Sequence, residues 1–336
     1  MNRPLALLVV LALLSTSHGA DPARFEYEEP HMGTKFRVVL YAPDKATADK
    51  AAAAAFARVA ELNRVMSDYL PTSDLSLLCQ KSSTASAGPV KVSDDLFFVL
   101  SKSREIAAMS DGAFDVTIAP VIKLWRQARK DRRLPDPEVL QAALKKVGYQ
   151  KMVLNEKAGT VDLRVAGMQL DLGGIGKGFA ADAGLEAIAK FGVTSALVAA
   201  SGDIAVSGPP PGKAGWRIDI AALPGSKEKR TLLLHDAAVS TSGDAEQFVE
   251  ISGVRYSHIV DPKTGHGLTG RRSVSVIARR GYQADGMTKM AMIMPADKAM
   301  EAIEKVEGVA TLIVVKTPTG EDVKQSKRFA TLVAKE

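Results

Sequence analysis

The sequence predicts an α+β fold built from mixed, largely antiparallel sheets with flanking helices. Strand-like runs often follow one another across short turns, which is typical of hairpins. Helix-like segments lie between them without the regular strand–helix–strand alternation of a parallel sheet. The chain has 336 residues, of which 46% are hydrophobic, and it shows no solenoid-type repeat. We therefore expect one domain over residues 21–336, preceded by an export signal over residues 1–20.

The first elements follow from their apolar patterns and their caps. Residues 35–41 predict a strand, and the Ala-rich run 46–66 predicts a long helix. A second helix covers residues 93–109, because its first serine is a good N-cap and two acidic residues follow at the positive end of the helix. A third helix begins at Pro137 and stops before Gly148.

The segments after residue 150 predict a hairpin, a glycine turn and a helix. Residues 151–155 and 160–164 form the hairpin, and residues 170–172 form a short strand that leads into the glycine turn. A helix then covers residues 178–190 and ends at Gly192. The remaining prediction comprises strands at 195–200, 216–221, 230–235, 248–252, 272–278, 309–316 and 327–334, and helices near 285–293 and at 296–306.

Charge and cysteine content exclude several classes of protein. The net charge is +6, but basic and acidic residues are interspersed, and the short basic cluster 227–230 is too small to predict nucleic-acid binding. The single cysteine, Cys79, excludes an intramolecular disulfide and a cysteine-cluster zinc site. Its apolar surroundings predict a small core residue.

The N-terminus predicts a cleavable signal peptide. Arg3 supplies the positive charge, residues 5–14 form an apolar core too short to span a bilayer comfortably, and small residues at 17–20 suit cleavage. The cleavage region contains no cysteine for lipid attachment. We therefore expect a periplasmic, soluble mature protein with no transmembrane segment, and an uncleaved anchor is the alternative.

The most informative stretch runs from Tyr256 to Gly265. His258 is the leading candidate for an acid/base imidazole because Asp261 and Thr264 follow it in the same turn. The alternative is a structural histidine before an ordinary turn of Asp, Pro, Lys, Thr and Gly. The competing histidines are His31, His235 and His266.

A second polar turn covers residues 170–178. Its glycines, at 173, 174, 176 and 178, let the backbone approach a ligand and turn N–H groups toward phosphate oxygens. The spacing matches neither the nucleotide loop that ends in Gly-Lys-Ser/Thr nor the dinucleotide fingerprint, so a tight strand-to-helix connection is the alternative. Asp171 lies within the apolar run of this segment and needs a partner or a ligand.

Two further acidic segments each allow two interpretations. Asp285 precedes an apolar helix-like run, so it either caps that helix or offers a hard oxygen ligand to Mg²⁺. Asp115 and Thr117 lie in a polar turn that feeds an apolar strand. They either bind a ligand or close the connection between a helix and that strand.

Taken in order, these segments resemble the ApbE-type family of periplasmic FAD:protein FMN transferases. The resemblance extends from residue 32 to about residue 310, nearly the whole mature chain. The matching blocks are residues 32–34, 66–69 with 73–76, 112–117, 170–178, 240–244, 256–265 and 284–285.

The resemblance implies an ApbE-like (T-fold-like) domain that uses FAD as substrate together with Mg²⁺. In family terms, the residues in contact with FAD are Met32, Tyr69, Ala113, Phe114, Asp115, Asp171 and Lys177. Gly174 offers its carbonyl and Asp285 its carboxylate to Mg²⁺, and His258 is the catalytic histidine.

The chain departs from the family pattern at the expected metal site. The family usually follows the metal aspartate with Ala-Leu-Ala-Thr, whose threonine binds the metal, whereas residues 286–289 are Gly-Met-Thr-Lys. Either the Lys289 ammonium replaces part of the cation's charge, or Thr288, one residue earlier, reaches the metal after a local shift. A milder departure is Ala200-Ser201-Gly202, where the family often has paired glycines.

The implied activity is the transfer of FMN from FAD to a threonine or serine of an acceptor flavoprotein, with release of AMP. Two alternatives stay open. One is an FAD-binding protein without transfer activity, and the other is an FAD pyrophosphatase that releases FMN and AMP.

Overall fold

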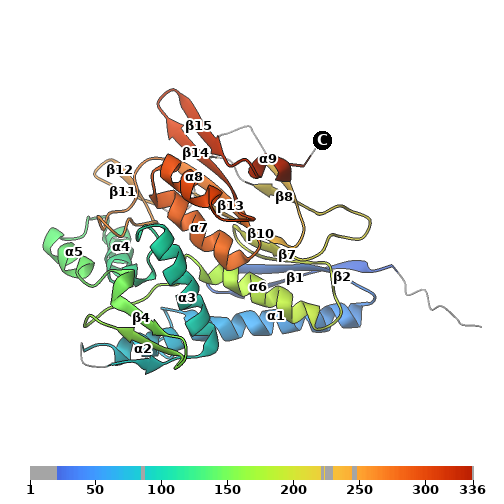
Figure 1. Ribbon diagram of the computed structural model, residues 1–336, viewed down its shortest axis with the longest axis horizontal. Helices are drawn as coiled ribbons and strands as arrows, with labels where there is room; N and C mark the ends of the chain where they lie inside the picture. The colour runs from blue at the N-terminus through green and yellow to red at the C-terminus, as the bar shows by residue number, and fades with distance from the viewer. Residues whose placement is uncertain (1–20, 85–87, 221–222, 224–229, 244–247, 335–336) are drawn as a thin grey trace, which may run out of the picture.

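The centre of the molecule is an eight-stranded sheet in which every described pair of neighbouring strands is antiparallel (Figure 1). The computed structural model describes residues 21–84, 88–220, 223, 230–243 and 248–334. In spatial order the strands are β1 (Ala23–His31), β2 (Thr34–Ala42), β6 (Ala196–Ala200), β7 (Asp203–Val206), β10 (Ala237–Gly243), β13 (Arg272–Ala278), β14 (Ala310–Thr317) and β15 (Gly320–Gln325). The predicted α+β class is confirmed.

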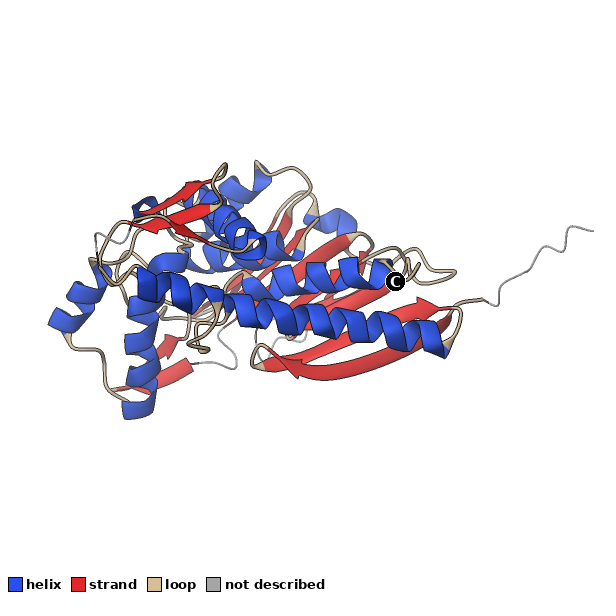
Figure 2. Ribbon diagram, turned by 90° about the horizontal axis from the view of Figure 1, so that it is seen from below, coloured by secondary structure: helices blue, strands red, loops and turns tan. Residues whose placement is uncertain are grey.

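One face of the sheet is covered by helices (Figures 1 and 2). Period-two alternation along β2 sends Phe36, Val38 and Leu40 into the core beneath these helices, whereas Val39 packs on the opposite face. The covering helices are α1 (Lys45–Met66), α3 (Asp94–Met109), α6 (Gly176–Ala189), α7 (Gly281–Ile293) and α8 (Ala296–Glu304).

A smaller layer covers the other face. The hairpin of β8 (Trp216–Ile220) and β9 (Arg230–Leu234) packs there with the short α9 (Phe329–Leu332). Trp216 and Phe329 supply the large apolar side chains of this second core. The sheet therefore buries both of its faces, which explains why its strands are apolar at consecutive positions.

A third cluster lies beside the sheet and forms one wall of the site described below. Trp125 and Leu140 are at its centre. It joins α4 (Ala119–Asp131) and α5 (Pro137–Leu144) to the hairpin β11 (Phe248–Ile251) and β12 (Val254–Ser257). The remaining elements are α2 (Asp74–Lys81), the small sheet of β3 (Val90–Lys91), β5 (Thr160–Leu163) and β4 (Met152–Asn155), and the 3₁₀ turns η1 (Val116–Ile118) and η2 (Tyr149–Lys151).

Helices α6 and α7 meet through two glycines near their first turns. A Cβ at Gly178 would lie 2.1 Å from the Gly281 carbonyl oxygen, so only glycine permits this approach. Each helix also provides a carboxylate that accepts hydrogen bonds from backbone N–H groups in the first turn of the other helix. Asp182 of α6 accepts hydrogen bonds from the backbone N–H groups of Gly281 and Tyr282, and Asp285 of α7 accepts one from Gly178 N–H at 3.2 Å.

Most of the predicted elements are present in the structure, with ends shifted by a few residues. Two predicted strands are wrong. Residues 170–172 join no ladder, although the Asp171 N–H donates a hydrogen bond to the Val116 carbonyl. The strand predicted at 327–334 is wrong because those residues contain the short helix α9. The strand that pairs with β14 is instead β15, which the prediction missed because this edge strand is rich in charged residues.

Several helix boundaries and capping roles also differ from the prediction. Helix α7 begins at Gly281, so Asp285 lies inside the helix and does not cap it. The Ser93 side chain makes no capping hydrogen bond. Asp115 leads into η1 and α4 rather than into an apolar strand.

The sequence prediction also omitted β1, α2, β3, η1, α4, η2, β7, β10 and β12. The export signal expected at 1–20 lies outside the described residues, and a single domain over 21–336 stays a prediction. Across the described ranges, no helix combines the length and apolar character that a bilayer crossing requires.

We expect Gly178→Ala to lower the free energy of unfolding by about 3 kcal/mol, because its Cβ would collide with the backbone of α7. Gly176→Ala is the matched control in the same turn, since its Cβ would meet nothing closer than Met66 Cε at 3.8 Å. Urea unfolding of both variants measures the difference. Equal stability of the two would contradict the proposed close contact.

Burial outweighs the two backbone hydrogen bonds to Asp182 and raises the pKa of this carboxyl to about 6. Between the unfolded value of 3.8 and this raised value, the folded state holds a proton that the unfolded chain has lost. As pH rises through that window, ionisation of Asp182 therefore reduces the free energy of unfolding by up to about 3 kcal/mol. Urea unfolding of wild type and Asp182→Asn should show wild type losing stability relative to the variant up to about pH 6 and no further change above it. A pH-independent difference would refute this effect.

Candidate active site

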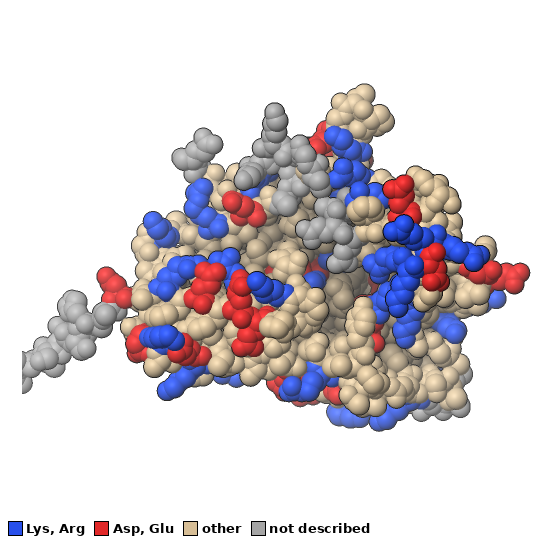
Figure 3. Space-filling view, turned by 180° about the vertical axis from the view of Figure 1, so that it is seen from behind, with Lys and Arg blue, Asp and Glu red and all other residues tan. Residues whose placement is uncertain are grey.

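A cavity of about 1010 Å³ opens where the glycine turn before α6, the loop after β12 and the C-terminal half of α7 converge. The face seen from behind is hollowed near its middle, and Lys and Arg side chains gather beside the hollow (Figure 3). The cavity lining brings together nine of the predicted site residues, namely Met32, Tyr69, Ala113, Phe114, Asp115, Asp171, Gly174, Lys177 and His258.

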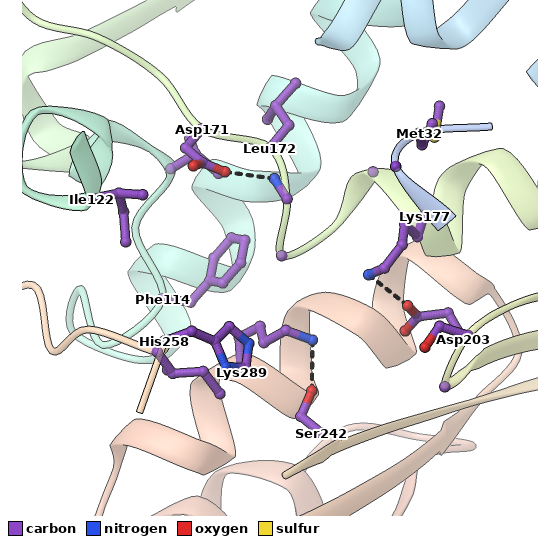
Figure 4. Close-up of a pocket in the computed structure, with 18 of the residues that line it drawn as sticks. Met32, Phe114, Ile122, Asp171, Leu172, Lys177, Asp203, Ser242, His258 and Lys289 are labelled. Atoms are coloured by element: carbon purple, nitrogen blue, oxygen red, sulfur yellow. Dashed lines mark hydrogen bonds and ion pairs between the residues drawn. The ribbon is translucent and has the colours of Figure 1, made fainter. Parts of the chain in front are cut away.

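Asp171 has the partner that its apolar surroundings require. Its Oδ2 accepts a hydrogen bond from Arg126 Nη2 at 2.8 Å. Its Oδ1 accepts one from Gly173 N–H at 2.7 Å (Figure 4). Burial and the nearby Asp68 carboxylate raise the pKa of Asp171. The carboxylate therefore holds the glycine turn in shape while it borders the cavity.

Arg126 connects three residues of this wall. Its guanidinium donates to Asp68 Oδ2 at 2.5 Å as well as to Asp171, and its Cζ lies 4.4 Å from the centroid of the Tyr69 ring. Tyr69 is nevertheless 74% exposed at the rim of the cavity. An exposed aromatic ring held in place by an arginine is suited to pack against a planar ligand.

Asp115 uses its carboxylate within its own turn. Oδ1 accepts hydrogen bonds from the backbone N–H and the hydroxyl of Thr117, and Oδ2 accepts one from Tyr149 N–H. The Thr117 hydroxyl in turn accepts one from Gly148 N–H. The structure thus supports the second interpretation of these two side chains, which close a connection, while residue 115 itself borders the cavity.

Lys177 lies in the first turn of α6 and points into the cavity (Figure 4). Its Nζ lies 2.6 Å from Asp203 Oδ2 and 3.9 Å from Asp285 Oδ2. Burial opposes its charge, but Asp285 and Asp203 together raise its pKa, so Lys177 stays a cation.

Because the glycines in the turn before α6 lack side chains, Lys289, Phe114 and Asp171 can pack closely against it. A Cβ at Gly174 would lie 3.1 Å from Lys289 Cγ and 3.3 Å from Phe114 Cε2, and a Cβ at Gly173 would lie 2.9 Å from Asp171 Oδ1. Larger residues would displace the groups that line the cavity. The turn is therefore both a tight connection and a wall of the site, so the two interpretations of its glycines are compatible.

His258 borders the cavity immediately after β12. Backbone bonds between Ser257, Ile259 and Leu268 hold its segment, and the following turn closes through Gly265 N–H and the Asp261 carbonyl. Trp125 Nε1 donates to the Gly265 carbonyl at 2.7 Å, which anchors this turn to α4. The Asp–Pro–Lys–Thr–Gly stretch is therefore a turn that positions the histidine.

The residues expected to bind Mg²⁺ are not arranged as a metal site. The Asp285 carboxylate already contacts Lys289 Nζ at 3.0 Å, and the Thr288 hydroxyl donates to the Ala284 carbonyl at 2.6 Å. The Lys289 stem packs against Gly174. Among the residues that the structure describes, no group of three or more His, Cys, Asp or Glu side chains could hold a metal ion.

Sequence reasoning missed three residues that shape the cavity: Arg126, Asp203 and Ser242. Arg126 lies on the overlooked helix α4, whose signal was a proline near its start followed by spaced apolar residues. Asp203 follows the tight turn between β6 and β7, where Ser201 has a φ of 58°. Nothing in the local sequence reveals that Asp203 faces a lysine of α6.

These features define a class of protein. An α+β scaffold carries an open cavity with two lysines, an arginine-held tyrosine and a histidine, which is the lining that an anionic, ring-containing ligand of dinucleotide size requires. The sequence profile of the ApbE family matches residues 32–313.

Relatives and solved structures of the same kind match most of the chain. The FAD:protein FMN transferase of Salmonella typhimurium is 29% identical over 94% of this chain and 91% of its own length, and that of Treponema pallidum is 33% identical over 72% and 71%. The apo flavinyl transferase ApbE of Pseudomonas stutzeri superposes with a TM-score of 0.82 at 26% identity, covering 94% of this chain and 98% of its own. The chain belongs to the ApbE family.

We expect Lys177→Met to lower the free energy of unfolding by about 3–5 kcal/mol, because it leaves Asp203 without its nearest cation in a buried position. Adding Asp203→Asn should recover part of that loss, since the double variant removes the uncompensated charge. Urea unfolding of the single and double variants tests this. A single variant as stable as wild type, or no recovery in the double variant, would contradict the pairing.

Proposed function

We propose that the protein is an FAD:protein FMN transferase, which moves FMN from FAD to a threonine or serine hydroxyl of an acceptor flavoprotein and releases AMP. The observation that carries the proposal is the convergence of His258, Lys177 and Tyr69 on one cavity in a chain of this family. Membership of the family and the names of its relatives support the same activity.

FAD would lie along the cavity with its diphosphate near Lys177 and the glycine turn. The ammonium groups of Lys177 and Lys289 both border the cavity and offer positive charge to phosphate oxygens. Tyr69 and Phe114 offer aromatic surfaces to a ring of the cofactor. Met32 borders the cavity near Lys177 (Figure 4).

Transfer is an in-line displacement at the phosphorus of the FMN half. The acceptor hydroxyl oxygen forms the new P–O bond while the bond from that phosphorus to the bridging oxygen breaks, and AMP leaves with the bridging oxygen. His258 would take the hydroxyl proton as general base. The two lysines would stabilise the charge that develops on the phosphate oxygens, where catalysis rests on positioning and charge neutralisation.

This sequence of events includes no step at Mg²⁺, because the Asp285 carboxylate pairs with Lys289 and the Thr288 hydroxyl donates to the Ala284 carbonyl. We place the reaction outside the cytoplasm, in the periplasm, and the basic, apolar and small-residue pattern of residues 1–20 supports that assignment.

The test is incubation of the mature protein with FAD and a candidate exported flavoprotein, followed by denaturing electrophoresis. A fluorescent acceptor band supports transfer. Free FMN and AMP without a labelled acceptor would indicate a pyrophosphatase, and FAD retention without products would indicate a binding protein.

We expect His258→Ala to reduce transfer about a hundredfold or more, the usual effect of losing a general base, while FAD affinity is retained. His235→Ala is the control, because that side chain is exposed and does not border the cavity. In-gel flavin fluorescence measures transfer, and quenching of FAD fluorescence measures binding. Loss of FAD binding in a folded His258→Ala protein, or unchanged transfer, would refute the role as a base.

A further inference from the structure

Asp285 lies beneath the floor of the cavity and is 0% exposed. It faces the cavity only through two lysines, with Lys289 Nζ 3.0 Å from Oδ1 and Lys177 Nζ 3.9 Å from Oδ2. Oδ2 also accepts the hydrogen bond from Gly178 N–H. Both carboxylate oxygens therefore already have positively charged or polar partners.

Lys289 occupies the space between Asp285 and the glycine turn. It lies one helical turn after Asp285 on α7, and its aliphatic stem packs on Gly174, where an added Cβ would meet Lys289 Cγ at 3.1 Å. Its Nζ also donates to Ser242 Oγ at 2.7 Å (Figure 4). The side chain is 16% exposed, so it is held by three neighbours rather than extended into solvent.

Among the residues that the structure describes, this arrangement leaves no ligand set for a divalent cation between residues 174 and 285. A protonated lysine has three donors and no lone pair, so it cannot bind a metal. An added cation would have to displace the ammonium from Asp285 and would be repelled by Lys177 on the other side. Thr288 does not substitute, because its hydroxyl is held by the carbonyls of Ala284 and Ser240.

The charges balance without a metal. Lys177 and Lys289 carry two positive charges, and the buried Asp203 and Asp285 carry two negative ones. Burial opposes ionisation of Asp285, yet the two ammonium groups hold its pKa below the ordinary value. An ammonium fixed in this way can face a phosphate oxygen as a permanent part of the protein.

We propose that the Lys289 ammonium takes the position and supplies part of the charge of a divalent cation, so that this protein binds a diphosphate ligand without a bound metal. The statement about metal binding is independent of the transferase activity. Its extension to catalysis, that transfer proceeds without Mg²⁺, rests on the proposed function.

Titration with Mn²⁺, followed by the electron paramagnetic resonance signal of the free ion, tests the metal statement directly. We expect the wild-type protein, with and without FAD, to bind no stoichiometric Mn²⁺ up to millimolar concentrations beyond what FAD alone binds. We expect Lys289→Thr to bind one Mn²⁺ per chain, because the oxygen ligand and the vacated space then face Asp285. One tight Mn²⁺ on the wild type would overturn the proposal, and so would a folded Lys289→Thr protein that binds none.

Two further variants separate charge from folding. Lys289→Gln keeps a hydrogen-bond donor but removes the charge, and it should weaken FAD binding at least about tenfold, the usual cost of losing a charge-assisted contact. Lys298→Thr removes a charge from an α8 side chain that is 71% exposed and outside the cavity, so FAD affinity should stay unchanged. Unchanged FAD affinity in a folded Lys289→Gln protein would overturn the role of the ammonium.

The catalytic extension is tested with a chelator. Transfer by the wild type should be unaffected by EDTA, whereas transfer by Lys289→Thr should require added Mg²⁺. Wild-type transfer that EDTA abolishes and Mg²⁺ restores would overturn the extension. Failure of all transfer would refute the proposed function alone, because the Mn²⁺ and FAD titrations still report on Lys289.

Discussion

The contact between the first turns of α6 and α7 is the constraint on which the site depends. Gly178 and Gly281 bring the helices so close that each supplies a carboxylate to the other's N–H groups. Lys177 is adjacent to one glycine, and Asp285 and Lys289 follow the other by one and two turns. Because the backbones are in contact, the spacing of these charged groups is fixed by the fold rather than by flexible side chains.

The same contact explains how four charged groups are tolerated beneath a cavity. An isolated buried carboxylate would shift its pKa and become neutral. Here Asp285 and Asp203 meet Lys177, and Lys289 completes the set, so each charge has an opposite charge within reach. The cavity floor therefore presents both ammonium groups together with Asp203, and the Asp285 carboxylate remains beneath them.

The sequence predicted the fold class and most regular elements, and nine of its eleven predicted site residues border the cavity, whereas Asp285 and Thr288 do not. Period-two and helical apolar patterns identified elements such as β2 and α1, because each buries one face or stripe in a single core. The errors fall where tertiary contacts decide. Leu170 and Leu172 are apolar but pair with no strand in the described structure. The charged strand β15 pairs because β14 offers an open edge. The pairing of Asp203 with Lys177 depends on a sheet turn meeting a helix start, which no local pattern encodes.

The open sheet ends in two outer strands, β1 and β15, whose unpaired backbone groups could recruit another chain. Both strands carry features that discourage such recruitment. Glutamates alternate along β1 and Pro30 lies near its end, while β15 is short and contains Glu321, Asp322 and Lys324. The molecule thus limits its own tendency to aggregate edge to edge, which would help it remain dispersed at high local concentration.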